Sequence, residues 1–385
     1  MTVWKAVVGQ ERQIEPLVKA AGDLTAMTHA WLLTGPPGSG RSSAARAFAA
    51  ALLCDLGGCG ACHDCTTALV GTHADVTLVA TDKVTISIEE VRDLVGLAQR
   101  APSGGRWRII VIEDADRMTE RTSNVLLKAI EEPPPRTVWV LCAPSANDVA
   151  ITIRSRCRIV PLRVPPADVV ATLLVERDGI EPGLALEAAL AAQSHIGVAR
   201  RLARDDEARA RRSQVLALAT EVRGVGDAVL AAADLAAVAD DDSEAATTER
   251  DADERAELFT TLGADDSGRL PPALRAQVRQ LEEDQKRRAT RAKRDVLDRA
   301  IVDLMSLYRD VAAIQLGAVP QVPLINVSHE SHVRELAGKT SLADTMRCID
   351  ALSTARERLA ANVQPVLALE ALILALRVRA TSLIS

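Results

Sequence analysis

Residues 35–42 read Gly-Pro-Pro-Gly-Ser-Gly-Arg-Ser and have the glycine spacing of a phosphate-binding loop. An apolar run typical of a buried strand precedes them, and an alanine-rich run typical of a helix follows. The glycines allow backbone N–H groups to surround an anion, and the start of the helix adds partial positive charge. A glycine- and proline-rich surface turn is the alternative, but it needs no flanking strand and helix. We predict a phosphate loop of Gly35, Pro36, Gly38, Ser39, Gly40, Arg41 and Ser42.

Arg41 stands where an ATP-hydrolysing loop carries lysine. The lysine ammonium is a compact charge that bridges the β- and γ-phosphates, whereas a guanidinium is longer and planar and is not an equivalent replacement. Ser42 keeps the hydroxyl that reaches Mg²⁺ in such loops. The sequence therefore predicts that hydrolysis is lost, and it leaves open whether ATP or ADP still binds with Mg²⁺.

Two further positions around the expected nucleotide depart from an ATPase pattern. Glu113 precedes Asp114 at the end of an apolar run, whereas an ATPase places Asp first, for the Mg²⁺ shell, and Glu second, to activate water. A displacement of ~1 Å at a catalytic group can cost ~10²-fold in rate. Residues 142–144, Cys-Ala-Pro, also lack the threonine or asparagine that would sense the γ-phosphate. Three independent changes thus indicate that the chain does not hydrolyse ATP at this loop.

A group of cysteines follows the helix expected after this loop, in the pattern C-x4-C-x2-C-x2-C. Two-residue spacings let neighbouring thiolates converge on one tetrahedral ion, and four ligands leave no open position for catalysis. A redox pair is the alternative, weakened because there are two C-x-x-C steps without thioredoxin-like surroundings. We interpret His63 as solvent-facing, and Cys142, Cys157 and Cys348 as small residues in or near cores. We predict a structural Zn²⁺ site at Cys54, Cys59, Cys62 and Cys65.

Composition limits the class of protein. The chain has 385 residues, enough for two or three domains, and 48% hydrophobic but only 2% aromatic residues, which favours helices. A net charge of −6 argues against binding nucleic acid through overall charge. Neither an apolar leader nor a run near ~18 apolar residues occurs, so we expect a cytoplasmic protein without a membrane partner.

The chain divides into three predicted domains. Apolar runs at 30–33, 76–79, 108–112 and 138–141 alternate with helical patterns, which predicts an α/β domain with a parallel sheet over residues 1–163. Prolines then precede a small helical domain at 164–207, and the rest, 208–385, is predicted to be helical, interrupted by an acidic, solvated insertion at about 240–268. We interpret the basic residues of 281–304 as a solvated helix face and 366–376 as an apolar helix that Asn362 caps.

Several of these segments together resemble one family. They are the phosphate loop with its helix, the cysteine insertion after that helix, Leu-Leu-Lys-Ala-Ile-Glu-Glu-Pro-Pro at 126–134 and Arg-Ser-Arg-Cys at 154–157. Val-Gly-Gln at 8–10 and residues 361–370 agree. The chain strongly resembles the delta-prime family of bacterial clamp-loader subunits, which belongs to the AAA+ superfamily and to the DNA polymerase III holoenzyme. The likeness spans all three domains except the acidic insertion.

This resemblance implies the fold and the partners. The fold would be an AAA+ P-loop domain with a zinc module, a helical lid and an all-helical C-terminal collar. The partners would be one delta subunit and three gamma or tau ATPase subunits in a pentameric ring, which opens the sliding clamp and places it on primer–template DNA in the replisome at the nucleoid. The subunit would have no catalytic activity of its own, although it is part of a DNA-directed DNA polymerase holoenzyme.

The resemblance also assigns residue roles. The second arginine of the motif, Arg156, would reach a neighbouring ATP site as an arginine finger, since a guanidinium delivered in trans stabilises transition-state charge. Without the family it would read as a surface ion pair. Arg154 flanks it in an ordinary role, and Arg200 is equally a phosphate sensor or a surface charge. An active AAA+ ATPase with Arg41 in place of lysine is the first alternative function, and an independent zinc-dependent DNA binder is the second.

Overall fold

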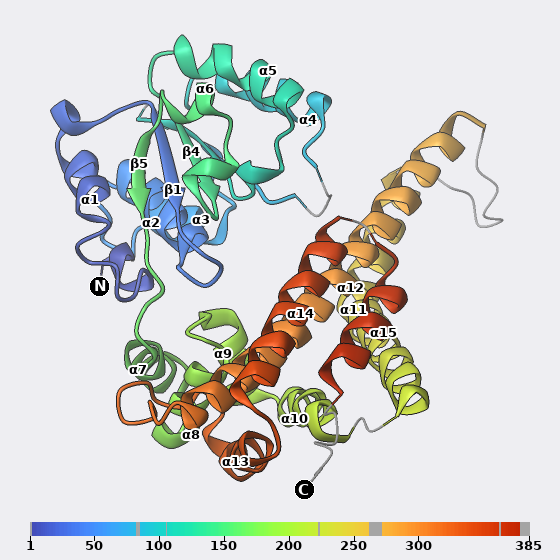
Figure 1. Ribbon diagram of the computed structural model, residues 1–385. Coiled ribbons are helices and arrows are strands. Elements are labelled where there is room, and N and C mark those ends of the chain that lie inside the picture. Colours follow the sequence, from blue (N-terminus) through green and yellow to red (C-terminus); the bar gives the residue numbers. More distant parts are fainter. Residues whose placement is uncertain are drawn as a thin grey trace, which may run out of the picture. The chain divides into compact units, whose positions relative to one another are not determined.

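The chain forms two compact units in this computed structural model, Met1–Ala203 and Arg204–Ser385. Figure 1 shows a sheet with helices in the first unit and helices alone in the second. The structure describes residues 2–81, 85–104, 106–221, 224–261, 272–361 and 363–377.

The first unit is built on a parallel sheet of five strands in the order β2-β3-β4-β1-β5. The predicted parallel sheet is therefore confirmed, and four of its strands lie where the apolar runs predict them. Three of these are buried along their whole length, as expected for strands covered by helices on both faces. The four are β1 (Ala30–Thr34), β2 (Val76–Val79), β3 (Arg108–Ile112) and β4 (Thr137–Ala143).

The fifth strand, β5 (Arg158–Pro161), was not predicted from the sequence. It lies at the sheet edge beside β1, and of its four residues only Val160 is buried. An edge strand tolerates polar residues and proline, so it lacks a continuous apolar run. Arg158 instead stacks over the Trp31 ring, 5.2 Å from its centroid. Pairing with β1, and not local composition, forms this strand.

Alternate residues of the strands feed two separate cores. In β4, Val138, Val140 and Cys142 pack on one face, and Trp139 and Leu141 pack on the other. This follows from the two-residue period of a strand. Residues of α1 (Glu15–Gly22), α2 (Arg41–Leu53) and α3 (His63–Val70) join the first core, and residues of α4 (Ile88–Ala98), α5 (Glu120–Glu131) and α6 (Ile151–Arg154) join the second.

Three short helices complete the first unit, as predicted from apolar residues spaced three and four apart. They are α7 (Ala167–Asp178), α8 (Pro182–Ala191) and α9 (Ile196–Arg204), the last of which begins two residues after a left-handed pair, Gln193 and Ser194.

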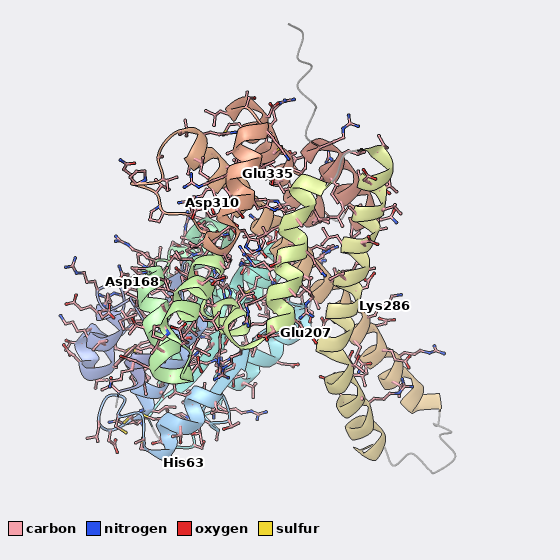
Figure 2. All side chains as sticks on the ribbon, turned by 90° about the horizontal axis from the view of Figure 1, so that it is seen from below. His63, Asp168, Glu207, Lys286, Asp310 and Glu335 are labelled. Atoms are coloured by element: carbon pink, nitrogen blue, oxygen red, sulfur yellow. The ribbon has the colours of Figure 1, made fainter. Side chains whose placement is uncertain are left out.

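The second unit is entirely helical in its described residues, with one apolar core. Asp310, labelled in Figure 2, is fully buried and accepts hydrogen bonds from the backbone N–H groups of Ile325 and Asn326 at 2.8–3.1 Å. None of the described helices of the chain combines the length and apolar character needed to cross a membrane. The described α-helices of the second unit are α10 (Asp206–Glu221), α11 (Val225–Thr261), α12 (Pro272–Gln315), α13 (Glu330–Lys339), α14 (Leu342–Ala360) and α15 (Pro365–Leu376).

The predicted apolar C-terminal helix is α15, with Pro365 in its first turn. Its predicted cap, Asn362, lies outside the described residues.

The expected helix interruption at residues 240–244 is wrong, because α11 runs through them to Thr261. Alanines between the acidic residues favour a helix, and ion pairs join α11 to α12. Lys293 Nζ lies 2.5 Å from Asp240 Oδ1, and an Arg255 nitrogen lies 3.5 Å from a Glu282 oxygen. The rest of the predicted insertion, 262–268, lies outside the described residues. Lys286, on the predicted basic face of α12, is exposed (Figure 2).

Candidate functional site

The predicted phosphate loop, residues 35–42, begins directly after β1 and ends in the first two residues of α2. Gly38 and Gly40 take positive φ angles of 86° and 84°, and Gly40 is the N-cap of α2. At Gly35 a Cβ atom would lie 2.6 Å from Ser39 Oγ and 2.8 Å from the Leu162 carbonyl oxygen, so a larger residue does not fit. The loop therefore has the tight turns that allow its N–H groups to face an anion at the helix start.

Arg41 is turned back onto this loop. Its Nη1 donates to the Gly35 carbonyl oxygen at 2.5 Å. The Gly35 N–H in turn points at the Ala143 and Pro144 carbonyl oxygens, at 3.3 and 3.2 Å, which ties the loop to the end of β4. The guanidinium thus stabilises the start of the loop, a role that a lysine ammonium would not fill with the same planar geometry.

The two carboxylates after β3 each have a cationic partner within the chain. Arg46, one turn into α2, donates to Glu113 Oε1 from Nη2 at 2.9 Å and from Nε at 3.2 Å, and the Glu113 side chain is only 14% exposed. Asp114 accepts from the Thr81 N–H at 3.2 Å and lies 3.6 Å from Arg117 Nε. Such pairing supplies the positive charge that a divalent cation would otherwise bring to Glu113.

Burial shifts the proton affinities of two neighbours of these carboxylates. Burial, with a smaller contribution from the Glu113 charge, raises the pKa of the Cys142 thiol to about 12, so it is neutral. Burial also raises the pKa of Asp116, and the nearby Asp114 carboxylate adds to this rise. The predicted non-polar role of Cys142 in the core is confirmed.

Gln10 holds the loop against the segment that follows β5. This side chain, 1% exposed, donates through Nε2 to the Ser39 carbonyl oxygen at 3.1 Å and to the Arg163 carbonyl oxygen, and its Oε1 accepts from the Arg163 N–H at 3.1 Å. In the sequence, Gln10 contributed only to the family resemblance, and the pairing of Arg46 with Glu113 was not predicted. A buried glutamine far from the loop in sequence carries no local signal of this contact.

His195, in the turn between α8 and α9, lies directly against the loop. A Cβ atom built on Gly38 would lie 2.8 Å from His195 Cα, so the backbone of the turn is in contact with the glycine. Arg200, on α9, is paired with Asp178 on α7 at 3.1 Å and is half-exposed. This pair gives Arg200 a partner on the helical segment itself.

Arg156 lies in the turn between α6 and β5, and its contacts in the described part of the chain are with α5 and α6. Its Nη2 is 2.5 Å from Glu131 Oε1, and its Nη1 donates to the Thr152 carbonyl oxygen at 2.8 Å. Its side chain is 38% exposed. Arg154 faces Asn147, with 2.5 Å between Nη1 and Oδ1. The structure thus places Arg156 on the surface, anchored at one end of its guanidinium.

The predicted cysteine site comes together in space. The ligand atoms of the four residues lie within 4.8 Å of one another, and the sulfurs of Cys54 and Cys62 are 3.8 Å apart. A tetrahedral Zn²⁺ with Zn–S bonds of about 2.3 Å has sulfur–sulfur edges of about 3.8 Å. Backbone N–H groups of Cys59, Cys62 and Cys65 point at sulfurs at 3.3–3.4 Å. The four cysteines could hold a metal ion.

The pKa values of Cys54 and Cys59 are lowered, which favours the thiolate form at these two cysteines. Burial alone would raise the pKa of Cys54, but hydrogen bonds from the backbone N–H groups of Cys59, Gly58 and Leu56 outweigh it and lower the pKa to about 6. Similar N–H donors lower the pKa of Cys59. Burial raises the pKa of Cys65. His63 is the exposed first residue of α3, as its predicted solvent exposure requires.

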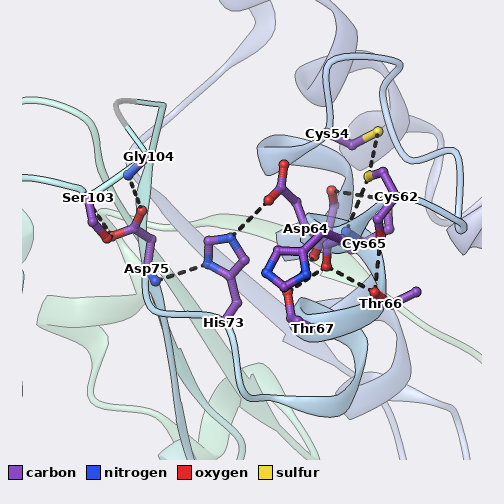
Figure 3. A network of polar contacts seen from close by, with 12 residues as sticks. Cys54, Cys62, Asp64, Cys65, Thr66, Thr67, His73, Asp75, Ser103 and Gly104 are labelled. Atoms are coloured by element: carbon purple, nitrogen blue, oxygen red, sulfur yellow. Dashed lines mark hydrogen bonds and ion pairs between the residues drawn. The ribbon is translucent and has the colours of Figure 1, made fainter.

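A polar network joins this module to the sheet (Figure 3). Asp64, within the cysteine cluster, lies 3.5 Å from Nε2 of His73, whose Nδ1 accepts from the Asp75 N–H at 3.0 Å. The Asp75 carboxylate is 1% exposed and accepts three hydrogen bonds of 2.7 Å from Ser103 and Gly104, and Arg108 lies 3.1 Å away. Burial raises the pKa of Asp75, but the Gly104 and Ser103 hydrogen bonds outweigh it, so the net pKa is lowered.

Replacing Asp75 by asparagine is expected to lower the free energy of unfolding by about 3 kcal/mol at pH 7, because an N–H₂ group would face N–H donors and Arg108 would lose its partner. Since folding lowers the pKa of Asp75, its stabilisation is present above the ordinary carboxyl pKa and is lost as the pH falls below about 4. Urea unfolding of both chains should thus show a difference that shrinks on acidification. Asp55→Asn, at an 89% exposed side chain paired with Arg106, is the control and should change little. A pH-independent difference would contradict this account.

Comparison with known proteins places this geometry in a family context. Residues 9–166 match a family model described as DNA polymerase III, delta subunit. The delta-prime subunit of DNA polymerase III from Pseudomonas aeruginosa is 37% identical over 170 residues, 42% of this chain and 52% of that protein. The gamma/tau subunit from Mycobacterium tuberculosis is 32% identical over 182 residues, 45% of this chain and 31% of that protein. The delta-prime match confirms the predicted resemblance to delta-prime subunits, and the similarity to gamma/tau subunits is a further finding.

The chain spans about half the length of its delta-prime relative and less of the gamma/tau relative. The matched family segment contains the loop, the cysteine module and Arg156, but not the helical second unit. A solved gamma-subunit-related protein from Thermotoga maritima covers 95% of this chain and 98% of its own at 16% identity, with a TM-score of 0.40, too low to support an argument.

Proposed function

We propose that this chain is a clamp-loader subunit of the delta-prime type, which acts in DNA replication to place the sliding clamp on primed DNA. The observation that carries the proposal is the match of residues 9–166 to the delta family model. The partners would be delta and the gamma or tau ATPases in a pentameric ring, with clamp and primer–template DNA engaged through the complex, in the cytoplasm at the nucleoid. The boundaries near 163 and 207, with a lid and a collar, are part of this proposal.

Within such a ring this chain would not hydrolyse ATP. Arg41, which replaces the loop lysine, is engaged with the Gly35 carbonyl. Glu113, which stands where an ATPase has the Asp of the Mg²⁺ shell, is paired with Arg46 and so already has a cation. Without a free carboxylate to hold Mg²⁺ or activate water, a bound nucleotide would lack the groups that stabilise transfer of its γ-phosphate. The loop is then an inherited scaffold.

The catalytic contribution would come from Arg156 in trans. Its guanidinium is accessible and fixed by a nearby carboxylate and carbonyl, as a group that reaches a neighbouring phosphate must be. Delivered to the ATP site of the neighbouring subunit, it would stabilise the charge that develops on the transferred phosphoryl group. The cysteine cluster would hold a structural Zn²⁺, because its four thiolate donors close the coordination shell.

An active ATPase is the second candidate function, and the similarity to gamma/tau subunits supports it. Titration of ATP with Mg²⁺ into the isolated chain, together with a turnover assay, separates the two. We expect no ATP turnover above background. Where ATP binds, the heat of binding should be the same with and without Mg²⁺, because the Glu113 carboxylate is already paired with Arg46. Mg²⁺-dependent binding together with ATP hydrolysis by the isolated chain would favour the second candidate. In that case Arg46→Ala should change neither the binding of ATP with Mg²⁺ nor its hydrolysis.

A reconstitution assay tests the function of the whole chain. With delta, gamma or tau, the clamp and primed DNA present, we expect clamp loading to require this chain. Complexes that load the clamp equally well without it would contradict the proposal, whichever way the ATP titration turns out.

A further inference from the structure

Glu131, the last residue of α5, contacts the guanidinium of Arg156. Its Oε1 lies 2.5 Å from Arg156 Nη2, and the two side chains are 39% and 38% exposed. The Thr152 carbonyl oxygen accepts from Nη1 at 2.8 Å, and Ser155 Oγ lies 3.2 Å from the same atom. The guanidinium is therefore held from two elements of its own unit, α5 and α6.

These contacts use only part of the donor capacity of Arg156. A guanidinium carries five N–H donors in a fixed planar fork. Its Nη1 and one Nη2 hydrogen face the chain's own oxygens, and no described residue accepts a hydrogen bond from Nε. The remaining N–H groups stay available for an anion that approaches from outside the chain.

We propose that Glu131 is a positioning residue for Arg156, an inference that rests on the proposed finger role of that arginine. A free arginine side chain samples many rotamers, and ordering it on contact with phosphate would cost side-chain entropy. The Glu131 carboxylate restricts the guanidinium before the neighbouring subunit arrives, so its free N–H groups already face outward. Preorganised donors of this kind are worth more in the transition state than donors that must be ordered during the reaction.

The test uses the reconstituted complex and follows ATP hydrolysis as a single turnover that resolves each site. Glu131→Ala is expected to lower the single-turnover rate at the neighbouring site about fivefold, equivalent to about 1 kcal/mol, the upper end for half-exposed ion pairs, with ATP affinity and assembly unchanged. Glu131→Gln, which keeps a hydrogen-bond acceptor, should stay within about twofold of the parent. Glu132→Ala is the matched control, because no described arginine contacts the exposed Glu132 carboxylate. Thermal melts of each variant verify folding.

Epistasis with Arg156 separates positioning from a merely structural effect. In an Arg156→Ala background, Glu131→Ala should cause no further loss, because its target is absent. A further loss there, an unchanged rate for Glu131→Ala alone, or a faster rate, which would make the ion pair a restraint to be broken, overturns the positioning role. If Arg156→Ala itself leaves hydrolysis intact, the finger assignment fails. If only Glu131→Ala is silent, the finger assignment stands and positioning fails.

Discussion

Arg156→Ala is expected to lower ATP hydrolysis by the reconstituted complex about 10³-fold at the neighbouring site, because a guanidinium delivered in trans stabilises the charge of the transferring phosphoryl group. If other sites in the ring keep their own arginines, the total rate falls less, so hydrolysis should be followed as a single turnover that resolves each site. Binding of this chain to its partners should be unchanged, since the side chain is half-exposed and forms one ion pair of the kind that adds little to stability.

Two variants sharpen this experiment. Arg154, the last residue of α6, lies two residues before Arg156 and faces Asn147, so Arg154→Ala should leave hydrolysis near the parent rate. Arg156→Lys keeps the charge but loses the planar fork, and we expect it to recover only a small part of the lost rate. Normal single-turnover hydrolysis at every site in the Arg156→Ala complex would refute the finger assignment.

Chelation of the Zn²⁺ proposed at the cysteine cluster is expected to have the second large effect. The four cysteine sulfurs converge within 4.8 Å, and without an ion the folded chain would lose the bonds that hold these sulfurs together. Loss of a structural metal belongs to the most destabilising changes, so we expect the free energy of unfolding to fall by about 4 kcal/mol or more on chelation. Elemental analysis should find one Zn²⁺ for each chain before chelation and none after it.

Substituting Cys59 by serine should abolish the bound Zn²⁺ and reproduce the chelator effect, because a hydroxyl is a poor ligand for this ion. Cys157→Ala, outside the cluster, should keep the full metal content. Protein that contains no metal and instead forms reversible disulfides within the cluster would support the redox alternative. Asp64→Ala is expected to keep Zn²⁺ but to weaken the link to His73, which makes the module open before the sheet does in hydrogen exchange.

Much of the fold followed from local pattern. The four apolar runs became strands because a strand covered on both faces needs continuous apolar sequence, and the helix periods became α7, α8 and α9. The edge strand β5 was not predicted because its sequence has no continuous apolar run, and the strand forms only through its pairing with β1. The helical course of α11 through the acidic residues escaped because Asp240 finds a partner on α12, some fifty residues on.

The sequence by itself determined which chemical groups are present: a phosphate loop with Arg41, the pair Glu113 and Asp114, four spaced cysteines, and the motif that contains Arg156. Their residue types and short spacings are enough to identify them, because a glycine turn and a C-x-x-C metal-binding turn are each formed by residues close together in the sequence. Only the tertiary structure decided the partners. It brings Arg46 to Glu113, turns Arg41 onto Gly35, and joins Glu131 to Arg156. Contacts between separate elements depend on how strands and helices pack, and no local spacing encodes that.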